Sequence, residues 1–314
     1  MKNYRLIGAI AISVSAILWG IDGVVLTPRL FNLDVSFVVF MLHLIPFTIL
    51  NIFLWKEYKH IKEMSKKDMI AFSLIAIFGG ALGTLSIVKA LFLMHFQHLT
   101  VVALLQKLQP IFAILLARIL LKEKFTKHYL ALSIFAIVGS YFLTFGMKLP
   151  SFATGDNTFQ AAMYALVAAF SFGSSTVFGK FVTNKYSFTT STFFRYGLTT
   201  LVMIIVILLT GKSFQFSQIT NQNWLFFGII GLTSGTGAIM LYYFGLKHVK
   251  AMTSAICELF FPVSAILFDY LINKSVLSIP QWIGAIVLIG AITSLIISQK
   301  RFNKEHYARR NEIL

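Results

Sequence analysis

Charged side chains are scarce in this sequence, and their scarcity excludes most classes of soluble protein. Asp, Glu, Lys and Arg make up 12% of the 314 residues, whereas a soluble domain carries about a quarter. Cysteine occurs once, at Cys257, which excludes an internal disulfide framework and a metal cluster held by cysteines. The sequence also lacks a Walker loop, an HExxH motif and a nucleophile elbow. We therefore expect no enzyme, no cofactor or metal, and no ATP-driven transport by this chain alone.

Hydrophobic residues are abundant instead, at 57% of the chain with a mean hydropathy of +0.80. Basic residues outnumber acidic ones by 27 to 11, a surplus that also occurs in nucleic-acid-binding proteins. Here the basic residues lie in short clusters between long apolar runs, as they do in proteins held in a lipid bilayer. The composition therefore predicts a protein whose partners are the bilayer and a small-molecule substrate, with no nucleic acid.

Ten segments are long and apolar enough to cross a bilayer, which requires about 20 mostly apolar residues. Short breaks separate them, and none of the breaks is long enough for a soluble domain. The predicted spans are 6–27, 34–55, 69–93, 98–121, 128–147, 159–183, 187–210, 223–246, 250–272 and 279–298. We therefore predict an all-α integral membrane protein of ten transmembrane helices, located in the cytoplasmic membrane of a bacterium.

The basic residues also predict the orientation, because loops rich in Lys and Arg stay in the cytoplasm. With ten crossings and an internal N-terminus, the basic clusters at 56–67, 118–127, 247–250 and 300–310 all fall on the inner side. The outer loops then hold only Arg29, Lys148, Lys212 and Lys274. We predict that both termini are cytoplasmic. The basic tail is interpreted as a flank of the last span, with binding to anionic lipid or a partner as the alternative.

The two halves of the sequence repeat one another. A shift of 152 residues places Gly79 over Gly231 and Pro110 over Pro262, and it aligns the AIL triplets that follow both prolines. Each half contains five spans, an odd number, so the second half must cross the membrane in the opposite sense. Inverted repeats are typical of transporters, whose substrate sites lie near the midplane where the halves meet. We assign a first repeat to 1–147, an external linker to 148–158, a second repeat to 159–298 and a basic cytoplasmic tail to 299–314.

Three segments follow the pattern of a known family. They read YYFGLKHVKAMTSAICELFFPVSAILFDYLI at 242–272, IPQWIGAIVLIGAI at 279–292, and ALFLMHFQHLTVVALLQKLQPIFAILLARILLKEKFTKHYLALSIFAIVG at 90–139. With the span count and the duplicated proline segment, they make nearly the whole chain resemble the drug/metabolite transporter superfamily in its ten-span form with two EamA domains. The resemblance implies a transporter built from two inverted five-helix repeats.

Two departures from the family pattern concern candidate site positions. The family often has a Glu before the proline of the fourth and ninth spans, where this sequence has Gln109 and Phe261. It also often has an Arg in the second and seventh spans, where this sequence has His43 and Arg195. The resemblance therefore supports the class of protein more firmly than any residue carried over from the family.

Ionisable side chains within the spans are the main candidates for contact with a substrate. A charge at membrane depth costs about 2.5–3.5 kcal/mol on insertion scales, so it faces a cavity or a partner. Helical spacing places further polar and aromatic residues on the same faces. The predicted substrate-binding residues are Trp19, Asp22, His43, Lys89, Gln106, Lys107, Gln109, Arg195, Tyr243 and Glu258.

Several of these residues also have a structural interpretation. Asp22 could pair with a lysine, and Lys89, near the outer end of its span, could extend to the interface. Arg195 could clamp a substrate carboxylate with two hydrogen bonds or pair permanently with Glu258. Lys107 lies deeper, and it is our principal candidate for selecting the charge of the substrate. Glu258 and Asp22 are the candidates for proton coupling, because a carboxylate beside a wet cavity can bind and release a proton.

Prolines and glycines recur inside the spans. Pro46, Pro110 and Pro262 predict kinks suited to gating, because proline frees a backbone carbonyl. The pairs Gly79 with Gly83 and Gly231 with Gly235 are small-xxx-small motifs, which let helices approach closely. We interpret these glycines as packing contacts between the central helices of the two halves.

The charges at membrane depth lead to a functional hypothesis. Lys89, Lys107 and Arg195 outnumber Asp22 and Glu258, which favours a zwitterion or an anion such as an amino acid over a simple organic cation. We predict a secondary active transporter, an exporter rather than an importer, that moves small polar metabolites by alternating access, with proton coupling or exchange. The alternatives are an exporter of organic cations or drugs, and a lipid-intermediate flippase or accessory membrane protein. Both a monomer and a homodimer fit the sequence.

Overall fold

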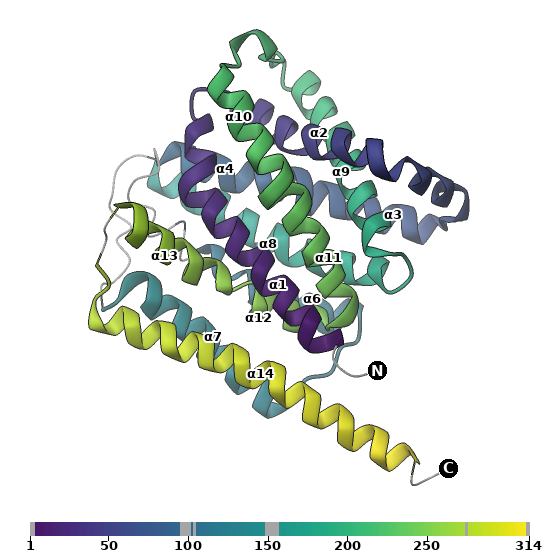
Figure 1. Ribbon diagram of the computed structural model, residues 1–314, viewed down its shortest axis with the longest axis vertical. Helices are drawn as coiled ribbons and strands as arrows, with labels where there is room; N and C mark the ends of the chain where they lie inside the picture. Colours follow the sequence, from purple (N-terminus) through teal and green to yellow (C-terminus); the bar gives the residue numbers. More distant parts are fainter. Residues whose placement is uncertain (1–3, 95–101, 103–104, 148–156, 274–275, 312–314) are drawn as a thin grey trace.

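The computed structural model describes residues 4–94, 102, 105–147, 157–273 and 276–311, and these residues are almost entirely helical, with no strand among them. The helices form a single bundle (Figure 1). The first repeat comprises α1 (Tyr4–Ile21), η1 (Asp22–Leu26), η2 (Thr27–Leu30), α2 (Val35–Leu54), η3 (Trp55–Glu63), α3 (Lys66–Leu74), η4 (Ile75–Leu82), α4 (Gly83–Leu93), α6 (Gln109–Leu120) and α7 (Lys127–Phe145). The second comprises α8 (Thr158–Thr183), α9 (Phe188–Leu209), η5 (Phe216–Gln218), α10 (Asn221–Ile230), η6 (Gly231–Gly237), α11 (Ala238–His248), α12 (Ala251–Cys257), α13 (Phe260–Asn273) and α14 (Ile279–Asn311).

The helices correspond to the ten predicted spans. Seven are long and apolar enough to cross a membrane by themselves: Tyr4–Leu30, Val35–Glu63, Lys66–Leu93, Lys127–Phe145, Phe159–Thr183, Phe188–Leu209 and Asn221–His248. Three shorter apolar helices, Gln109–Leu120, Ala251–Ala265 and Ile279–Leu295, coincide with the fourth, ninth and tenth predictions. Most of the predicted start of the fourth span and most of the predicted linker, at 148–156, lie outside the described residues. The all-α integral membrane fold is confirmed.

The third span of each repeat begins with the same local signal. Ser65 and Asp68 form a capping box at the start of α3, and Thr220 and Asn223 form one at the start of α10. In such a box two side chains satisfy two backbone N–H groups that the first turn leaves without helical partners. Both spans then widen into π-helical turns, at η4 and η6. The repeat in the sequence is therefore also a repeat in local structure.

Helices of one repeat pack against helices of the other in a reciprocal arrangement. In the second repeat α11 and α13 lie along α1, and in the first repeat α4 and α6 lie along α8. The last spans of the two repeats, α7 and α14, lie side by side along one edge of the bundle (Figure 1). This exchange of partners is what two copies of one five-helix unit with opposite orientation produce.

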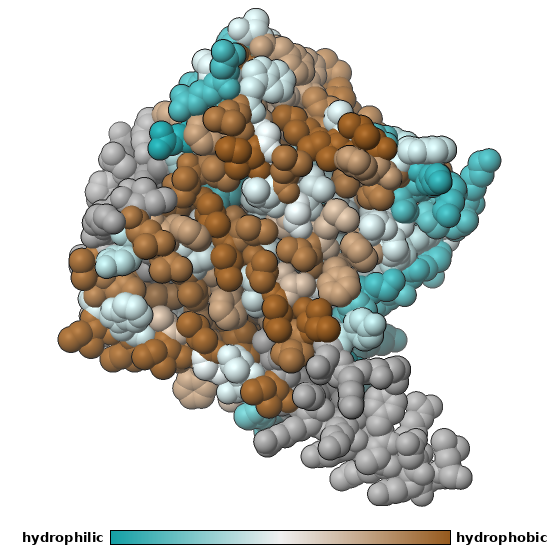
Figure 2. Space-filling model, in the orientation of Figure 1, coloured by the Kyte–Doolittle hydropathy of each residue, from teal (hydrophilic) through white to brown (hydrophobic). Residues whose placement is uncertain are grey.

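The outer surface suits a bilayer. Figure 2 shows apolar residues over the middle of the visible face and hydrophilic residues toward its two ends. Large apolar side chains on this kind of surface are strongly exposed, for example Phe53 at 75% and Leu209 at 82%. In water such exposure would be costly, whereas lipid tails solvate these groups.

The start of α1 and the end of α14 lie at the same end of the bundle, as an even number of crossings requires (Figure 1). Helix α14 has 33 residues, more than the about 20 that a span needs. Its C-terminal part therefore continues through most of the predicted tail at 299–314 and extends past the neighbouring helices (Figure 1).

Candidate functional site

A cavity of about 410 Å³ lies between the two repeats. This volume falls in the range of about 300–1,000 Å³ that is usual for small-molecule sites. Apolar and aromatic side chains form most of the wall, with polar groups placed among them. Eight of the ten predicted substrate-binding residues line it, namely Trp19, Asp22, His43, Gln106, Lys107, Gln109, Arg195 and Glu258. The fold thus brings residues that are far apart in the sequence around one space.

The cavity extends toward the end of the bundle that the charge pattern predicts to be external. Leu91 and Thr144, which line it, lie near the predicted external ends of α4 and α7. On the other side, Tyr243, Leu246 and Ile256 are fully buried, and α6 packs against α12. The cavity is therefore closed toward the predicted cytoplasmic side.

Two broken helices meet in the cavity wall. The chain turns at 107–108, just before α6, and at 258–259, between α12 and α13. Pro110 and Pro262 follow these turns and lie in the first turn of the next helix, where a missing N–H is tolerated. Pro46, in contrast, lies within the uninterrupted helix α2. Two of the three predicted kink sites are thus helix breaks, at matching positions in the repeats.

Gln109 and Glu258 connect the two breaks. The Gln109 Nε2 donates a hydrogen bond to the Glu258 carboxylate at 2.6 Å. Ser254 Oγ donates to the other carboxylate oxygen at 3.1 Å, and Thr176 Oγ1 lies 3.5 Å from it. These contacts satisfy part of the acceptor capacity of a carboxylate at membrane depth and leave its edge, with the amide of Gln109, in the cavity wall.

Arg195 lines the cavity and joins helices of both repeats, and the alternative in which it pairs with Glu258 is not formed. Its Nη2 donates to the backbone carbonyl of Gly79 at 3.0 Å, and its Nη1 lies 3.5 Å from Ser175 Oγ and 3.4 Å from the Tyr243 hydroxyl. The Gly79 carbonyl lies in the π-helical segment η4 and also accepts a hydrogen bond from Thr84 Oγ1 at 3.3 Å. The guanidinium therefore fastens the third span of the first repeat to α8, α9 and α11 of the second.

Two predicted substrate-binding residues do not line the cavity. Tyr243 is fully buried, and its hydroxyl contacts Arg195 instead of an open space. Lys89 is half-buried and lies outside the cavity lining in the described chain. Spacing along one helix placed each of them on a polar face, but it could not show which neighbouring helix covers that face.

Asp22 is held by hydroxyl groups, and the alternative in which it pairs with a lysine is not formed among the described residues. Thr27 Oγ1 and Ser234 Oγ each donate to its carboxylate at 2.8 Å. Trp19, one turn earlier, donates from its indole N–H to the carbonyl of Ser234 at 3.0 Å. The first span therefore contacts η6 of the other repeat through two side chains that also line the cavity.

The remaining predicted residues, His43, Gln106 and Lys107, also line the cavity. His43 is buried against Tyr196, with ring centroids 5.6 Å apart, and its Nδ1 lies 2.8 Å from the carbonyl of Val39. Gln106 and Lys107 line the cavity at the break before α6, and both are half-buried. Lys107, the principal candidate for selecting the charge of the substrate, thus lies at the cavity wall, and its role in charge selection stays a prediction.

Several residues of the cavity wall are not among those predicted from the sequence. Tyr242 and Thr176 share a hydrogen bond of 2.8 Å, and the Tyr242 ring lies 5.5 Å from that of Trp19. Ser234 and the aromatic rings of Phe172 and Phe261 also line the space. Serine, threonine and phenylalanine occur throughout membrane helices. No signal in the sequence separates those that face a cavity from those that face a helix.

The paired glycines are packing positions, but their partners differ from the prediction. A Cβ on Gly79 would collide with Ser175 and lie 3.0 Å from Arg195, and one on Gly83 would lie 2.9 Å from Phe172. In the second repeat, a Cβ on Gly231 would lie 2.8 Å from Ile45, and one on Gly235 would lie 3.2 Å from Pro46. Each pair thus packs against helices of the opposite repeat. The two spans that carry the glycines do not contact each other through them.

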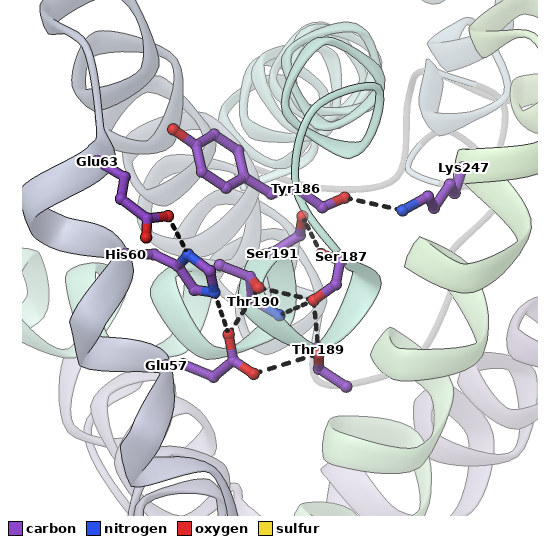
Figure 3. A network of polar contacts seen from close by, with 9 residues as sticks. All are labelled: Glu57, His60, Glu63, Tyr186, Ser187, Thr189, Thr190, Ser191 and Lys247. Carbon is purple, nitrogen blue, oxygen red and sulfur yellow. Dashed lines mark hydrogen bonds and ion pairs between the residues drawn. The ribbon is translucent and has the colours of Figure 1, made fainter.

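A polar network lies on the predicted cytoplasmic side (Figure 3). Glu57 of η3 accepts a hydrogen bond from Thr190 at 2.6 Å and lies 3.5 Å from Thr189, at the start of α9. Beside it, Lys185 forms an ion pair with Asp68, and this hydrogen bond raises the pKa of the lysine. The network ties the second and third spans to the loop before the seventh.

Glu123 adds a further contact on this side. Its carboxylate accepts hydrogen bonds from the backbone N–H groups of Ala251 at 2.9 Å and Met252 at 3.2 Å. A carboxylate at the N-terminus of a helix satisfies otherwise unpaired donors and interacts favourably with the helix dipole. The loop after α6 is thereby fastened to the start of α12.

Comparison with known proteins gives a consistent result. The pattern of the EamA-like transporter family matches twice, at residues 6–145 and 159–297. The chain is 52% identical over 289 residues to the riboflavin transporter ImpX of Fusobacterium nucleatum subsp. nucleatum, a match that covers 92% of this chain and 97% of that protein. It is 25% identical over 259 residues to the uncharacterized transporter sll1164 of Synechocystis, covering 78% of this chain and 70% of the relative.

The fold also has a counterpart among solved structures. One crystal structure superposes with a TM-score of 0.68 and covers 92% of this chain and 96% of its own. The sequence identity of that pair is 14%, so the likeness concerns the fold alone.

Proposed function

Because the chain belongs to the EamA-like transporter family, we propose that it carries riboflavin across the cell membrane and binds it in the central cavity. The observation that supports this substrate is the 52% identity, over nearly the full length of both chains, to a protein named as a riboflavin transporter. This identity adds a specific candidate substrate to the expected class, a membrane transporter of a small molecule.

The chemistry of the cavity supports a flavin. Riboflavin combines a planar fused-ring system with a polar dione edge and a flexible ribityl chain that carries hydroxyl groups. Trp19, Phe172 and Phe261 offer apolar and aromatic surface in the cavity wall, which suits a planar ring. Gln109 and Asp22 offer amide and carboxylate groups for the polar parts. A cavity of about 410 Å³ has the size expected for a ligand of this class.

We favour riboflavin over the amino acids that the number of charged side chains at membrane depth suggested. That count included Lys89 and Arg195, yet Lys89 lies outside the cavity lining and Arg195 is bonded to Gly79, Ser175 and Tyr243. Without these two cations the cavity has no surplus of positive charge among the residues used in the count. A substrate that is uncharged but rich in hydrogen-bonding groups fits this balance.

Transport would proceed by alternating access. In this cycle the packing of α6 against α12, together with the contacts of Glu57, Asp68 and Glu123, would hold the predicted cytoplasmic side closed. The breaks at 107–108 and 258–259 are the points about which the two halves of the fourth and ninth spans would reorient. The inverted repeat supplies the second conformation, in which the equivalent outer contacts close and the inner ones open.

Uptake into proteoliposomes tests the substrate. Purified protein in liposomes should take up labelled riboflavin faster than protein-free liposomes do. Unlabelled riboflavin should compete, whereas amino acids, organic anions and quaternary ammonium compounds should not. Protein-dependent uptake of labelled amino acids but not of riboflavin would overturn the proposal in favour of the zwitterion hypothesis, and uptake of quaternary ammonium compounds alone would favour a cation exporter.

A further inference from the structure

The cavity wall carries two polar sites of different hydrogen-bonding character, joined by aromatic rings. The first, here called the amide site, consists of Gln109 and Glu258 at the helix breaks. The second, here called the Asp22 cluster, consists of Asp22, Thr27 and Ser234. Both belong to the lining of the same cavity.

Aromatic side chains connect the two sites. Trp19 donates to the carbonyl of Ser234 at 3.0 Å, next to the Asp22 cluster. Its ring lies 5.5 Å from that of Tyr242, whose hydroxyl shares a bond of 2.8 Å with Thr176. Thr176 in turn lies 3.5 Å from Glu258. A ligand that contacts both polar sites would therefore lie along the rings of Trp19 and Tyr242.

The Asp22 cluster is suited to hydroxyl groups. An ionised carboxylate accepts at about four lone-pair positions and donates none. Thr27 and Ser234 already occupy part of this capacity with hydroxyl hydrogens, at 2.8 Å each. The capacity that remains toward the cavity fits further hydroxyl donors, and neighbouring hydroxyls on a polyol chain present such donors in a row.

The amide site is suited to a ring edge that alternates acceptor and donor. A carboxamide offers one acceptor and two N–H donors in one plane, so it can form two parallel hydrogen bonds with an adjacent C=O and N–H. The bond from Gln109 Nε2 to Glu258 fixes the plane of this amide and engages one of its N–H groups. The dione edge of a flavin presents the complementary pair.

We propose that the Asp22 cluster is the ribityl subsite of the flavin site, with Asp22 as the residue that distinguishes riboflavin from flavins without a polyol chain. Gln109 binds the dione edge, and the isoalloxazine ring lies against Trp19 and Tyr242. This inference rests on the proposed function and adds to it the orientation of the flavin in the cavity.

Two flavins that differ only in the chain provide the test. Lumiflavin carries a methyl group where riboflavin carries the ribityl chain, so it lacks every contact that the Asp22 cluster would make. Dissociation constants of both ligands can be measured on the purified full-length protein from the quenching of flavin fluorescence. The wild type should bind riboflavin at least tenfold more tightly than lumiflavin.

The variants separate the two sites. Asp22→Asn should weaken riboflavin binding by about tenfold and change lumiflavin binding by less than twofold, whereas Gln109→Leu should weaken both by a similar factor. Ser234→Ala, a smaller change, should weaken riboflavin alone by about threefold. Ser13→Ala is the matched control, because its hydroxyl bonds to the carbonyl of Ala9 on the same helix as Asp22, outside the cavity lining.

The outcomes distinguish this inference from the proposed function. If the wild type binds riboflavin but Asp22→Asn and Ser234→Ala weaken both flavins equally, or neither, the ribityl assignment is overturned while riboflavin transport stands. If the wild type binds neither flavin, both proposals fall.

Discussion

Among single residues, Arg195 joins the two repeats through a buried charge at membrane depth. It is 8% exposed, and its guanidinium reaches a backbone carbonyl in the first repeat and a tyrosine hydroxyl in the second. Arginine presents its donors in a rigid fork, which allows one side chain to serve partners on different helices. Removing that fork would leave the Gly79 carbonyl without a charged donor.

We expect Arg195→Lys to destabilise the protein while leaving substrate affinity nearly unchanged. Lysine keeps the charge but cannot reach Gly79, Ser175 and Tyr243 together, and each buried polar group left unsatisfied costs about 1–3 kcal/mol. Thermal unfolding of the purified protein should show the lower stability, and riboflavin titration of the folded protein should show a change below threefold. Unchanged stability with binding weakened tenfold would mean that Arg195 acts on the substrate.

Asp34 provides a pH-dependent contribution to stability. Burial opposes its ionisation, but hydrogen bonds from Lys212 and from the backbone of Ser36 outweigh this effect and hold the pKa of the carboxyl below its usual value. Because the pKa is lower in the folded state than in the unfolded state, the contribution is present above about pH 4 and is lost as the pH falls through the folded-state pKa.

Asp34→Asn should remove this pH dependence. The variant should be less stable than the wild type at pH 7, and the difference should shrink as the pH falls below about 4. Unfolding measured across this pH range provides the check. A difference that stays constant with pH would show that the ionised carboxyl is not the source of the stabilisation.

Among the elements, the π-helical spans depend on the absence of a side chain at particular glycines. Gly79→Ala should destabilise the protein by about 1–3 kcal/mol, because its Cβ would collide with Ser175 and crowd Arg195. Gly228→Ala is the matched control: it lies in α10, and nothing is within 4 Å of its added Cβ. The control should be neutral or more stable by about 0.5–1 kcal/mol. Equal thermal stability of the two variants would contradict the packing role of Gly79.

The short helix α12 provides a reporter of cytoplasmic closure. Glu123 caps its N-terminus, and Cys257, the single cysteine of the chain, lies buried at its end. We expect Glu123→Ala to raise the rate of Cys257 modification by a membrane-permeant maleimide several-fold, because loss of a cap of about 0.5–2 kcal/mol favours opening. Lys62→Ala, which removes an exposed charge of η3 on the same side, should leave the rate unchanged. An unchanged rate in Glu123→Ala would show that this contact does not hold the inner side closed.

For the whole molecule, the sequence predicts the architecture, but the contacts between the repeats only in part. Ten apolar segments and a 152-residue repeat suffice to predict an inverted pair of five-helix units, because hydropathy and length are properties of each segment alone. Charge at membrane depth also identified four residues of the cavity lining, Asp22, Lys107, Arg195 and Glu258, since such residues need a cavity or a partner.

The failures share one physical cause. Helical spacing grouped Tyr243 with polar neighbours, and one alternative placed Arg195 beside Glu258. Both expectations depend on how helices of opposite repeats are rotated relative to each other. A sequence defines the face of one helix but not the face opposite it. For the same reason Thr176, Ser234 and Tyr242 escaped notice, although each contributes a hydrogen bond at the cavity wall. The direction of transport stays a prediction, since an outward-extending cavity occurs in the cycle of importers and exporters alike.

Counterflow of riboflavin tests the central claim most directly. Proteoliposomes loaded with unlabelled riboflavin and placed in dilute labelled riboflavin should accumulate the label transiently above its equilibrium level, because a carrier with one alternating site exchanges substrate across the membrane. Trp19→Ala should lower the initial rate about tenfold, since stacking of an aromatic ring contributes about 1–3 kcal/mol. Accumulation in wild-type proteoliposomes no greater than in protein-free liposomes would contradict the account.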